Sequence, residues 1–242
     1  MTLAHLSFDS LAFLRLLQLA DSALPIGATA HSFGLETLTS EDEVGVEQLV
    51  PFCKDYLVEA GELECAFCIL GYRSAQASLV DSAAGLQQWL KLNTRLSAYK
   101  PARESRVASA MLGRRFLQLV AALEEETLLY NALATAKSQQ IETHYSTAFG
   151  LVGGLLNVGE QATALAYLQQ TLTALISASQ RLLPLGQSYA SAIQWQLKPL
   201  MGEIVIQSQQ AADNPEQLAT FTPLLDAGSM RHPTLITRLF IS

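Results

Sequence analysis

The chain has 242 residues, of which half are apolar and only 15% are charged. This composition supplies enough apolar side chains for a large core and excludes a chain that is disordered throughout. The net charge is −7 and no cluster of Lys and Arg interrupts the acidic balance, so we expect no nucleic-acid partner.

Other features bear on where the chain works. The first ten residues show no basic stretch ahead of a long apolar run, which argues against a secretory signal. The longest uncharged stretch, residues 161–180, is interrupted by Gln, Thr and Ser and indicates a soluble helix rather than a membrane span. Cys53, Cys65 and Cys68 are odd in number and close together, so they do not form a disulfide framework. We therefore expect a cytoplasmic protein with no membrane partner.

Helical periodicity dominates the first half of the chain. A first helix is expected to begin at Asp9 or Ser10, whose side-chain oxygen can cap it, and to stop before Pro25. Turn-forming residues predict a loop over residues 21–34. Further helices are expected in the ranges 47–60, 62–77 and 85–97 and from near 103 onward, with a break at Gly61.

The second half carries an unusual glycine cluster. Gly150, Gly153 and Gly154 lie in a helical pattern over residues 141–157, where each glycine costs roughly 1 kcal/mol relative to alanine. The cluster therefore predicts a close helix crossing where a side chain would not fit.

Prolines punctuate the remaining pattern. A helix over residues 161–183 should end at Pro184, and the next, from about 187, should be kinked at Pro199. The whole pattern predicts an all-α, single-domain bundle of about 8–11 helices over residues 1–225. Residues 226–242 are expected to form an exposed C-terminal tail that docks on a partner.

Candidate chemistry is sparse. Cys65 and Cys68 have the C-x-x-C spacing of redox and metal sites, but they lie inside a helical pattern, where two packed thiols are the alternative. The four histidines show no metal-ligand spacing: His5, His31, His144 and His232. We expect no enzymatic activity, no cofactor and no metal site.

Four stretches carry a family resemblance. Residues 24–36 read Leu-Pro-Ile-Gly-Ala-Thr-Ala-His-Ser-Phe-Gly-Leu-Glu, similar to L-P-I/V-G-G-F-S-H-S-x-G-L-E. Ala-Arg-Glu-Ser-Arg at 102–106 follows, with Gly-Arg-Arg at 113–115. The most specific, at 181–187, reads Arg-Leu-Leu-Pro-Leu-Gly-Gln and comes after His144, Phe149 and Gly150. Ser-Met-Arg-His at 229–232, then Thr234 and Arg-Leu-Phe at 238–240, ends the series. In this order they resemble the urease accessory protein F family.

This resemblance implies an all-α homodimer that acts in a complex. Its implied partners are a scaffold accessory protein that contacts urease, a nickel-carrying GTPase, and apo-urease. The chain would bridge the first two, govern the GTPase and assist nickel insertion. A helical adaptor for another cargo and a thiol-redox enzyme using Cys65 and Cys68 remain alternatives.

The resemblance also implies three groups of partner-binding residues. An early partner-facing loop would consist of Gly27, His31, Ser32, Gly34, Leu35 and Glu36. A dimer and GTPase-facing surface would consist of Arg181, Pro184, Gly186 and Gln187. The tail that orders against the scaffold would use Arg231, His232, Arg238, Leu239 and Phe240. Pro184 and Gly186 have an alternative role, which is simply to end a helix. For Arg181 the alternative is a salt bridge in the interior or at a helix end, near the negative end of the helix dipole.

The chain departs from the family pattern at several positions. Ala28 and Thr29 replace a usual Gly-Phe pair, and four tail positions are altered: Pro233, Leu235, Ile236 and Ile241. These changes affect the expected contacts of the tail rather than the fold.

Overall fold

The computed structural model describes residues 9–242. Residues 1–8, which include His5 and most of the segment inspected for a targeting signal, lie outside the described residues. All regular elements within 9–242 are helices, which confirms the predicted all-α class. The α-helices are α1 (Ser10–Leu19), α2 (Leu35–Ser40), α3 (Leu49–Tyr56), α4 (Glu62–Val80), α5 (Ser82–Ala98), α6 (Arg103–Glu124), α7 (Thr127–Ser138), α8 (Tyr145–Leu155), α9 (Glu160–Leu182), α10 (Gln187–Asp213) and α11 (Pro223–Arg231).

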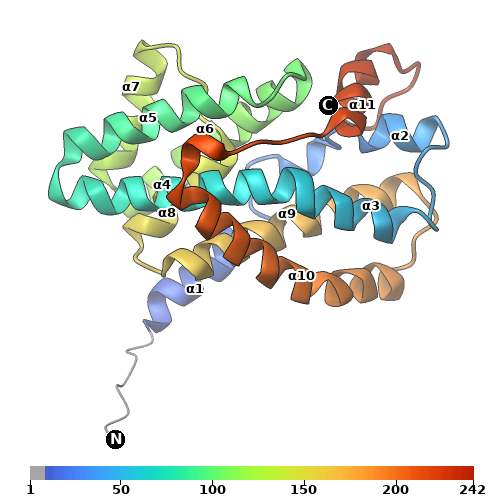
Figure 1. Ribbon diagram of the computed structural model, residues 1–242, viewed down its shortest axis with the longest axis horizontal. Coiled ribbons are helices and arrows are strands. Elements are labelled where there is room, and N and C mark those ends of the chain that lie inside the picture. The colour runs from blue at the N-terminus through green and yellow to red at the C-terminus, as the bar shows by residue number, and fades with distance from the viewer. Residues whose placement is uncertain (1–8) are drawn as a thin grey trace, which may run out of the picture.

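Short helical turns complete the path. They are η1 (Ala28–Ala30), the π-helical turn η2 (Leu57–Gly61), η3 (Pro215–Gln217) and η4 (His232–Thr234). Figure 1 shows α4 and α8 near the middle of the bundle, with α5, α9 and α10 around them. No helix within residues 9–242 combines the length and apolar content that a bilayer span requires.

The first helix begins as the sequence predicts. The Asp9 carboxylate accepts hydrogen bonds from the backbone N–H groups of Leu11 and Ala12, both at 3.0 Å. Two of the N–H groups that a helix leaves unpaired at its start are thereby satisfied. α1 ends well before Pro25.

The crossing of α4 and α8 depends on glycine. A Cβ atom at Gly150 would lie 1.8 Å from the Cys68 carbonyl oxygen, and one at Gly71 would lie 2.5 Å from the Thr147 carbonyl oxygen. At Gly154 the distance to the Tyr72 carbonyl oxygen would be 2.6 Å. The close crossing predicted from the glycine cluster is confirmed, because backbone fills the space where a side chain would project.

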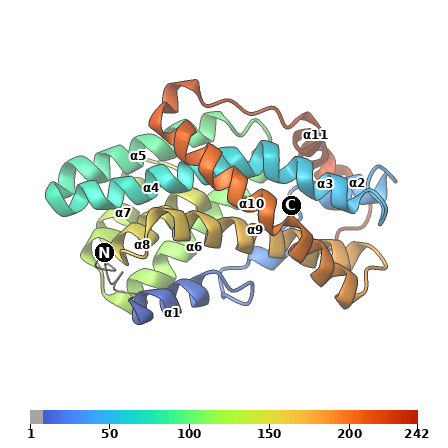
Figure 2. The ribbon, with the colours of Figure 1, turned by 60° about the horizontal axis from the view of Figure 1, so that its bottom comes forward.

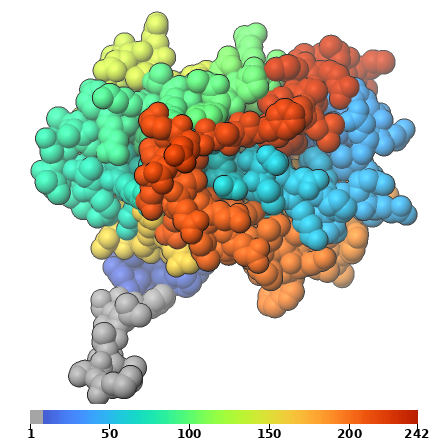
Figure 3. Space-filling view, viewed as in Figure 1, coloured from blue at the N-terminus to red at the C-terminus, as the bar shows by residue number. Residues whose placement is uncertain are grey.

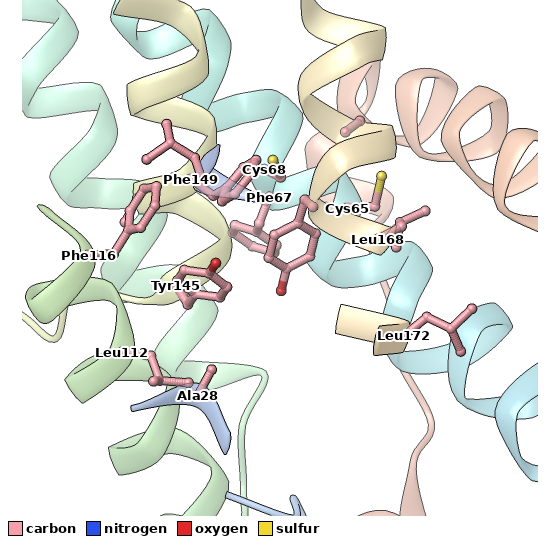
Figure 4. Packing of buried hydrophobic residues seen from close by; sticks show 14 of the residues in the cluster. Ala28, Cys65, Phe67, Cys68, Leu112, Phe116, Tyr145, Phe149, Leu168 and Leu172 are labelled. Carbon is pink, nitrogen blue, oxygen red and sulfur yellow. The ribbon is translucent and has the colours of Figure 1, made fainter. Parts of the chain in front are cut away.

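Aromatic rings pack beside this crossing, as Figure 4 shows for Phe67, Phe116, Tyr145 and Phe149. Phe116 stacks on Phe149 with 5.4 Å between ring centroids, and Tyr145 meets both rings edge-on. Such pairs contribute about 0.5–1.5 kcal/mol each beyond the burial of their area. The result is a tightly packed core to which the remaining helices attach.

The predicted break at Gly61 is wrong. α3, η2 and α4 follow one another without an intervening loop, and Gly61 is buried near Leu168. One glycine costs a helix roughly 1 kcal/mol, which is less than the gain from burying the neighbouring Leu57 and Leu63.

Three helices were not anticipated: α2, α7 and α11. α11 begins at Pro223 and ends at Arg231, so the boundary expected between residues 225 and 226 falls inside it. α9 ends at Leu182, two residues before Pro184, as predicted. α10 continues past Pro199 as one helix.

The C-terminal part of the chain returns to the N-terminal third. After α10, residues 214–222 cross the surface to α11, which packs against α2 and α6 (Figures 1 and 3). This path brings the last residues of the chain next to the loop before α2.

Candidate partner-docking site

The predicted early loop, Arg181 and the C-terminal tail meet in one place. We call this region the tail junction and define it by Ala30, His31, Ser32, Glu36, Arg181, His232 and residues 239–242. Its members come from η1 and α2, from the end of α9 and from the tail. Three stretches far apart in the sequence thus form one structural unit.

Glu36 is the central acceptor of the tail junction. It lies in the first turn of α2, is buried, and accepts hydrogen bonds from the backbone N–H groups of Leu239 at 2.5 Å and Phe240 at 3.2 Å. His232 Nε2 lies 2.7 Å from the same carboxylate. Hydrogen bonds to a charged acceptor contribute about 1.5–3 kcal/mol each, so this side chain holds the tail against α2.

A second set of hydrogen bonds joins the tail to the early loop. The backbone N–H of Ile241 donates to the Ala30 carbonyl oxygen at 2.8 Å. The Ser32 backbone N–H and hydroxyl both donate to the Ser242 carbonyl oxygen, at 2.5 and 3.1 Å. His31 Nδ1 lies 2.7 Å from the Ser242 hydroxyl oxygen. The loop and the tail are therefore paired largely through their backbones.

His31 is neutral in this arrangement. Burial, together with the positive charge of Arg115, lowers the pKa of His31 to about 4. A neutral imidazole carries one donor and one acceptor nitrogen, which suits a contact with a serine hydroxyl.

Arg181 fastens the junction from the side of α9. Its guanidinium donates to the carbonyl oxygens of Thr29 at 2.8 Å and Leu239 at 3.2 Å. It also lies over the Phe240 ring, 4.2 Å from the ring centroid, a cation–π contact. Arg181 lies in the last turn of α9, as the alternative of a charge at a helix end expects. Its contacts, however, are with the Thr29 and Leu239 carbonyl oxygens and the Phe240 ring and not with a carboxylate.

α11 approaches α2 at a left-handed glycine. Gly34 has φ of +91°, and a Cβ there would lie 2.8 Å from the Leu225 carbonyl oxygen. Glycine is needed at this position for both conformation and space. Arg231 extends the contact by pairing with Glu41 at 2.9 Å and Glu43 at 3.5 Å.

Side chains over residues 239–242 alternate between outside and inside. Phe240 and Ser242 are buried, whereas Ile236 is fully exposed and Leu239 and Ile241 are 61% and 67% exposed. Arg238 is exposed as well. The tail is thus held on its own chain and presents an apolar ridge, which we define as Ile236, Leu239 and Ile241.

The predicted residues divide into two sets in space. The junction brings together His31, Ser32, Glu36, Arg181, His232, Leu239 and Phe240. His31, Ser32 and Glu36 are buried and contact the tail, and Leu35 is buried in the core, so none of the four faces solvent. Pro184, Gly186 and Gln187 are exposed at the turn between α9 and α10, where Pro184 follows the end of α9 and Gly186 precedes α10. Pro184 and Gly186 therefore lie where helices end and begin, as the helix-termination alternative expects.

Sequence reasoning missed some supporting residues. Arg115 lies against Gly27, within 2.6 Å of where its Cβ would be, and the Ser105 and Ser229 hydroxyls are 2.8 Å apart. Arg115 is the last residue of the matched Gly-Arg-Arg stretch at 113–115, which was the available signal. Ser242 carried none, because its role depends on contacts more than 200 residues away.

A cavity of about 120 Å³ lies beneath the early loop. Its lining includes His31, Tyr145, Tyr167 and the ion pair of Glu64 with Lys100. Burial alone would raise the pKa of Glu64, but Lys100 lowers it and keeps the carboxylate charged. Most of the cavity wall is apolar, and these few polar groups are the available partners for ordered water.

The cysteines do not favour thiol chemistry. Cys65 and Cys68 are buried on α4, and burial raises the pKa of Cys65 to about 12 and that of Cys68 well above its usual value. The thiolate is the reactive form, so neither side chain is activated. Across residues 9–242, no three His, Cys, Asp or Glu side chains are grouped closely enough to hold a metal ion.

Comparison with known proteins agrees with the matched stretches. The sequence model of the UreF family matches residues 44–198. The chain is 33% identical over 231 residues to a urease accessory protein UreF of Nostoc sp., covering 95% of this chain and 96% of that protein. It is 30% identical to a UreF of Corynebacterium glutamicum, covering 94% and 96%. It is 32% identical to a urease accessory protein F of Oryza sativa subsp. japonica, covering 92% and 82%. The chain therefore belongs to the UreF family of urease accessory proteins.

Proposed function

We propose that this chain assists nickel insertion into apo-urease by bridging a scaffold accessory protein and a nickel-carrying GTPase. It acts in the cytoplasm as a homodimer and governs the GTPase without an active site of its own. Nickel and the nucleotide are handled by its partners.

The tail junction is the observation that carries this proposal. The Glu36 carboxylate accepts hydrogen bonds from residues 239 and 240, and Ser32 and Arg181 donate to residues 242 and 239, so residues 239–242 are held in a fixed backbone conformation. Leu239 and Ile241 of the apolar ridge therefore face outward on a rigid support, and Ile236 is exposed just before them. Exposed apolar side chains next to charged ones are typical of protein interfaces, and a preorganised surface loses less entropy on binding.

In this proposal, the exposed residues among the predicted partner-binding residues form two faces. Arg238 and the apolar ridge would contact the scaffold accessory protein. Pro184, Gly186 and Gln187, at the turn between α9 and α10, would contact the GTPase. Arg181 lies between them and touches Leu239, so it links the tail to the end of α9. This arrangement suits a protein that holds two others at fixed positions.

The test is deletion of the gene in a urease-positive host, followed by complementation with the tagged chain. The expected result is normal amounts of urease polypeptide with little activity and little bound nickel, restored by the tagged chain. The scaffold protein and the GTPase should co-purify with the tag. Unchanged urease activity and nickel content after deletion, with neither protein retained on the tag, would contradict the proposal.

A further inference from the structure

The cavity beneath the early loop has the size of a small organic molecule. Its volume of about 120 Å³ is slightly below the roughly 150 Å³ of an apolar protein cavity that holds benzene. Most of the wall is apolar and includes Leu63, Leu112 and Leu175. Figure 2 shows α4 and α9, two of the helices that line it, side by side in the middle of the molecule. A molecule of about six non-hydrogen atoms therefore fits the space.

Two buried polar groups of the lining have no hydrogen-bond partner within residues 9–242. They are the Tyr145 hydroxyl and His31 Nε2, which belong to residues that are only 6% and 4% exposed. Buried polar groups without a partner are rare in native proteins, because nothing compensates the loss of their hydration. A bound molecule with its own donor and acceptor would supply the missing partners.

The Glu64 carboxylate is a third polar group with capacity to spare. One of its oxygens pairs with the Lys100 ammonium, and the other accepts a long hydrogen bond from the Tyr167 hydroxyl at 3.5 Å. The Tyr167 ring in turn lies 5.7 Å from the ring of Tyr145, centroid to centroid. A carboxylate has about four lone-pair sites, so Glu64 can accept a further N–H from a molecule in the cavity.

The charges of the lining select a neutral molecule. Glu64 and Lys100 neutralise each other as an ion pair, and His31 is uncharged. Asp226 is partly exposed and accepts a hydrogen bond from Thr222 at 3.0 Å. A carboxylate or ammonium ion would leave water for an apolar space without a free buried counter-charge, which is costly. A neutral head group that both donates and accepts hydrogen bonds matches the unpaired groups instead.

We propose that this cavity binds a small neutral primary amide whose short aliphatic body lies against the apolar wall. The NH₂ group of the amide donates to the Glu64 carboxylate, and its carbonyl oxygen accepts from the Tyr145 hydroxyl. Because so few atoms make contact, the dissociation constant is expected to be on the order of 1 mM.

The cover of the cavity links it to the tail junction. His31 and Ser32 line the cavity and also hold Ser242 through hydrogen bonds. When loop and tail separate, the cavity loses this part of its wall and the bound amide is released. A ligand that binds only the closed form shifts the equilibrium towards that form. The amide therefore stabilises the pairing of the loop with the tail.

Titration with three molecules of similar size tests the ligand class. The isotope-labelled chain is titrated at neutral pH with isobutyramide, isobutyrate and isobutylammonium, each up to roughly 50 mM, and backbone amide NMR signals are followed. Isobutyramide should shift the signals of Ala28, Leu63 and Tyr145 saturably and bind at least about tenfold more tightly than either ion. No saturable shift at these positions, or tighter binding of either ion, overturns the proposal.

Two substitutions test the place of binding. Tyr145→Phe removes the hydroxyl and keeps the ring, so it should weaken isobutyramide binding about fivefold to tenfold, whereas Tyr189→Phe, exposed on α10, should bind like the wild type. Ala174→Leu fills the cavity from a half-buried position and should abolish binding while the helical content stays the same. Wild-type affinity in Tyr145→Phe or in Ala174→Leu would contradict the assignment.

Amide hydrogen exchange tests the link to the tail. The backbone N–H groups of Ser32 and Ile241 join the loop and the tail. Isobutyramide at about ten times its dissociation constant should slow exchange at both about tenfold and leave Lys91, exposed on α5, unchanged. Unaltered exchange at Ser32 and Ile241 would refute the link. All these experiments use this chain alone, so their failure leaves the role in urease maturation untouched, and a failed co-purification leaves the cavity assignment untouched.

Discussion

At the scale of single residues, Glu36 connects parts of the chain that are about 200 positions apart. Its carboxylate receives two backbone N–H groups and His232, and it is buried. A buried charge is costly unless hydrogen bonds compensate it, and here three donors do so. The tail conformation therefore depends on this one side chain.

Replacing Glu36 by glutamine should loosen the tail. Glutamine offers one acceptor oxygen, and its NH₂ group would face one of the tail donors. We expect Glu36→Gln to lower the free energy of unfolding by about 1–3 kcal/mol. Amide hydrogen exchange at Leu239 and Phe240 should become faster. Glu47→Gln, at an exposed position, serves as the control. Unchanged exchange at Leu239 and Phe240 would show that Glu36 does not hold the tail.

Two buried histidines should make stability sensitive to mild acid. Burial lowers the pKa of His144 to about 3, with Lys100 adding to the effect, and that of His31 to about 4. In the unfolded chain both have a pKa near 6.5, so the unfolded state binds these protons first as pH falls. Stability is therefore full above about pH 6.5 and declines towards pH 4 by about 1.4 kcal/mol per pH unit for each histidine.

The variant His144→Gln isolates one of these contributions. It should be less stable than the wild type at pH 7, because it loses contacts to the Ser97 and Ser109 hydroxyls. Its stability should then fall less steeply, by about 1.4 kcal/mol per pH unit, between pH 6 and pH 5. Urea unfolding at several pH values measures the slope. An identical slope in both proteins would mean that His144 is not kept neutral by the fold.

At the scale of helices, the α4–α8 crossing tolerates no side chain on its glycines. Gly150→Ala should destabilise the fold by about 3 kcal/mol, because the new methyl group overlaps the Cys68 carbonyl. Gly202→Ala, where the space is open, should stabilise the monomer by about 0.5–1 kcal/mol at concentrations below self-association. Thermal unfolding compares the two, and equal effects would refute the distinction between a packed and an open glycine.

Local patterns explain which helices could be predicted. The apolar stripes of α6, α9 and α10 and the Asp9 cap of α1 are visible in the sequence because each is contained in one segment. α2 has only six residues, and its place is fixed by the distant tail. Gly61 was misjudged for the opposite reason, since tertiary burial overrides a local preference. The sequence likewise suggested most members of the tail junction through resemblance, though not Ser242, and the contact of Arg181 with Phe240 arises only from the fold.

At the scale of the whole molecule, we expect the helical bundle to act as a support for interaction surfaces. The tail junction lies where the N-terminal third, α9 and the C-terminal residues meet, so Leu239 and Ile241 of the apolar ridge are held by two other segments, residues 30–36 and the end of α9. The turn between α9 and α10 lies next to it along the chain. We propose that this ridge, rather than a catalytic centre, is what the protein contributes to its complex.

The affinity of the purified chain for the scaffold accessory protein tests this claim most directly. Leu239→Glu keeps the backbone N–H that Glu36 accepts but places a charge in the apolar ridge. We predict that it weakens binding at least about a hundredfold, as expected for a central interface residue. Leu79→Glu, at a 68% exposed position on α4, should bind like the wild type, and both variants should keep the wild-type helical content. Wild-type affinity in Leu239→Glu would contradict the account.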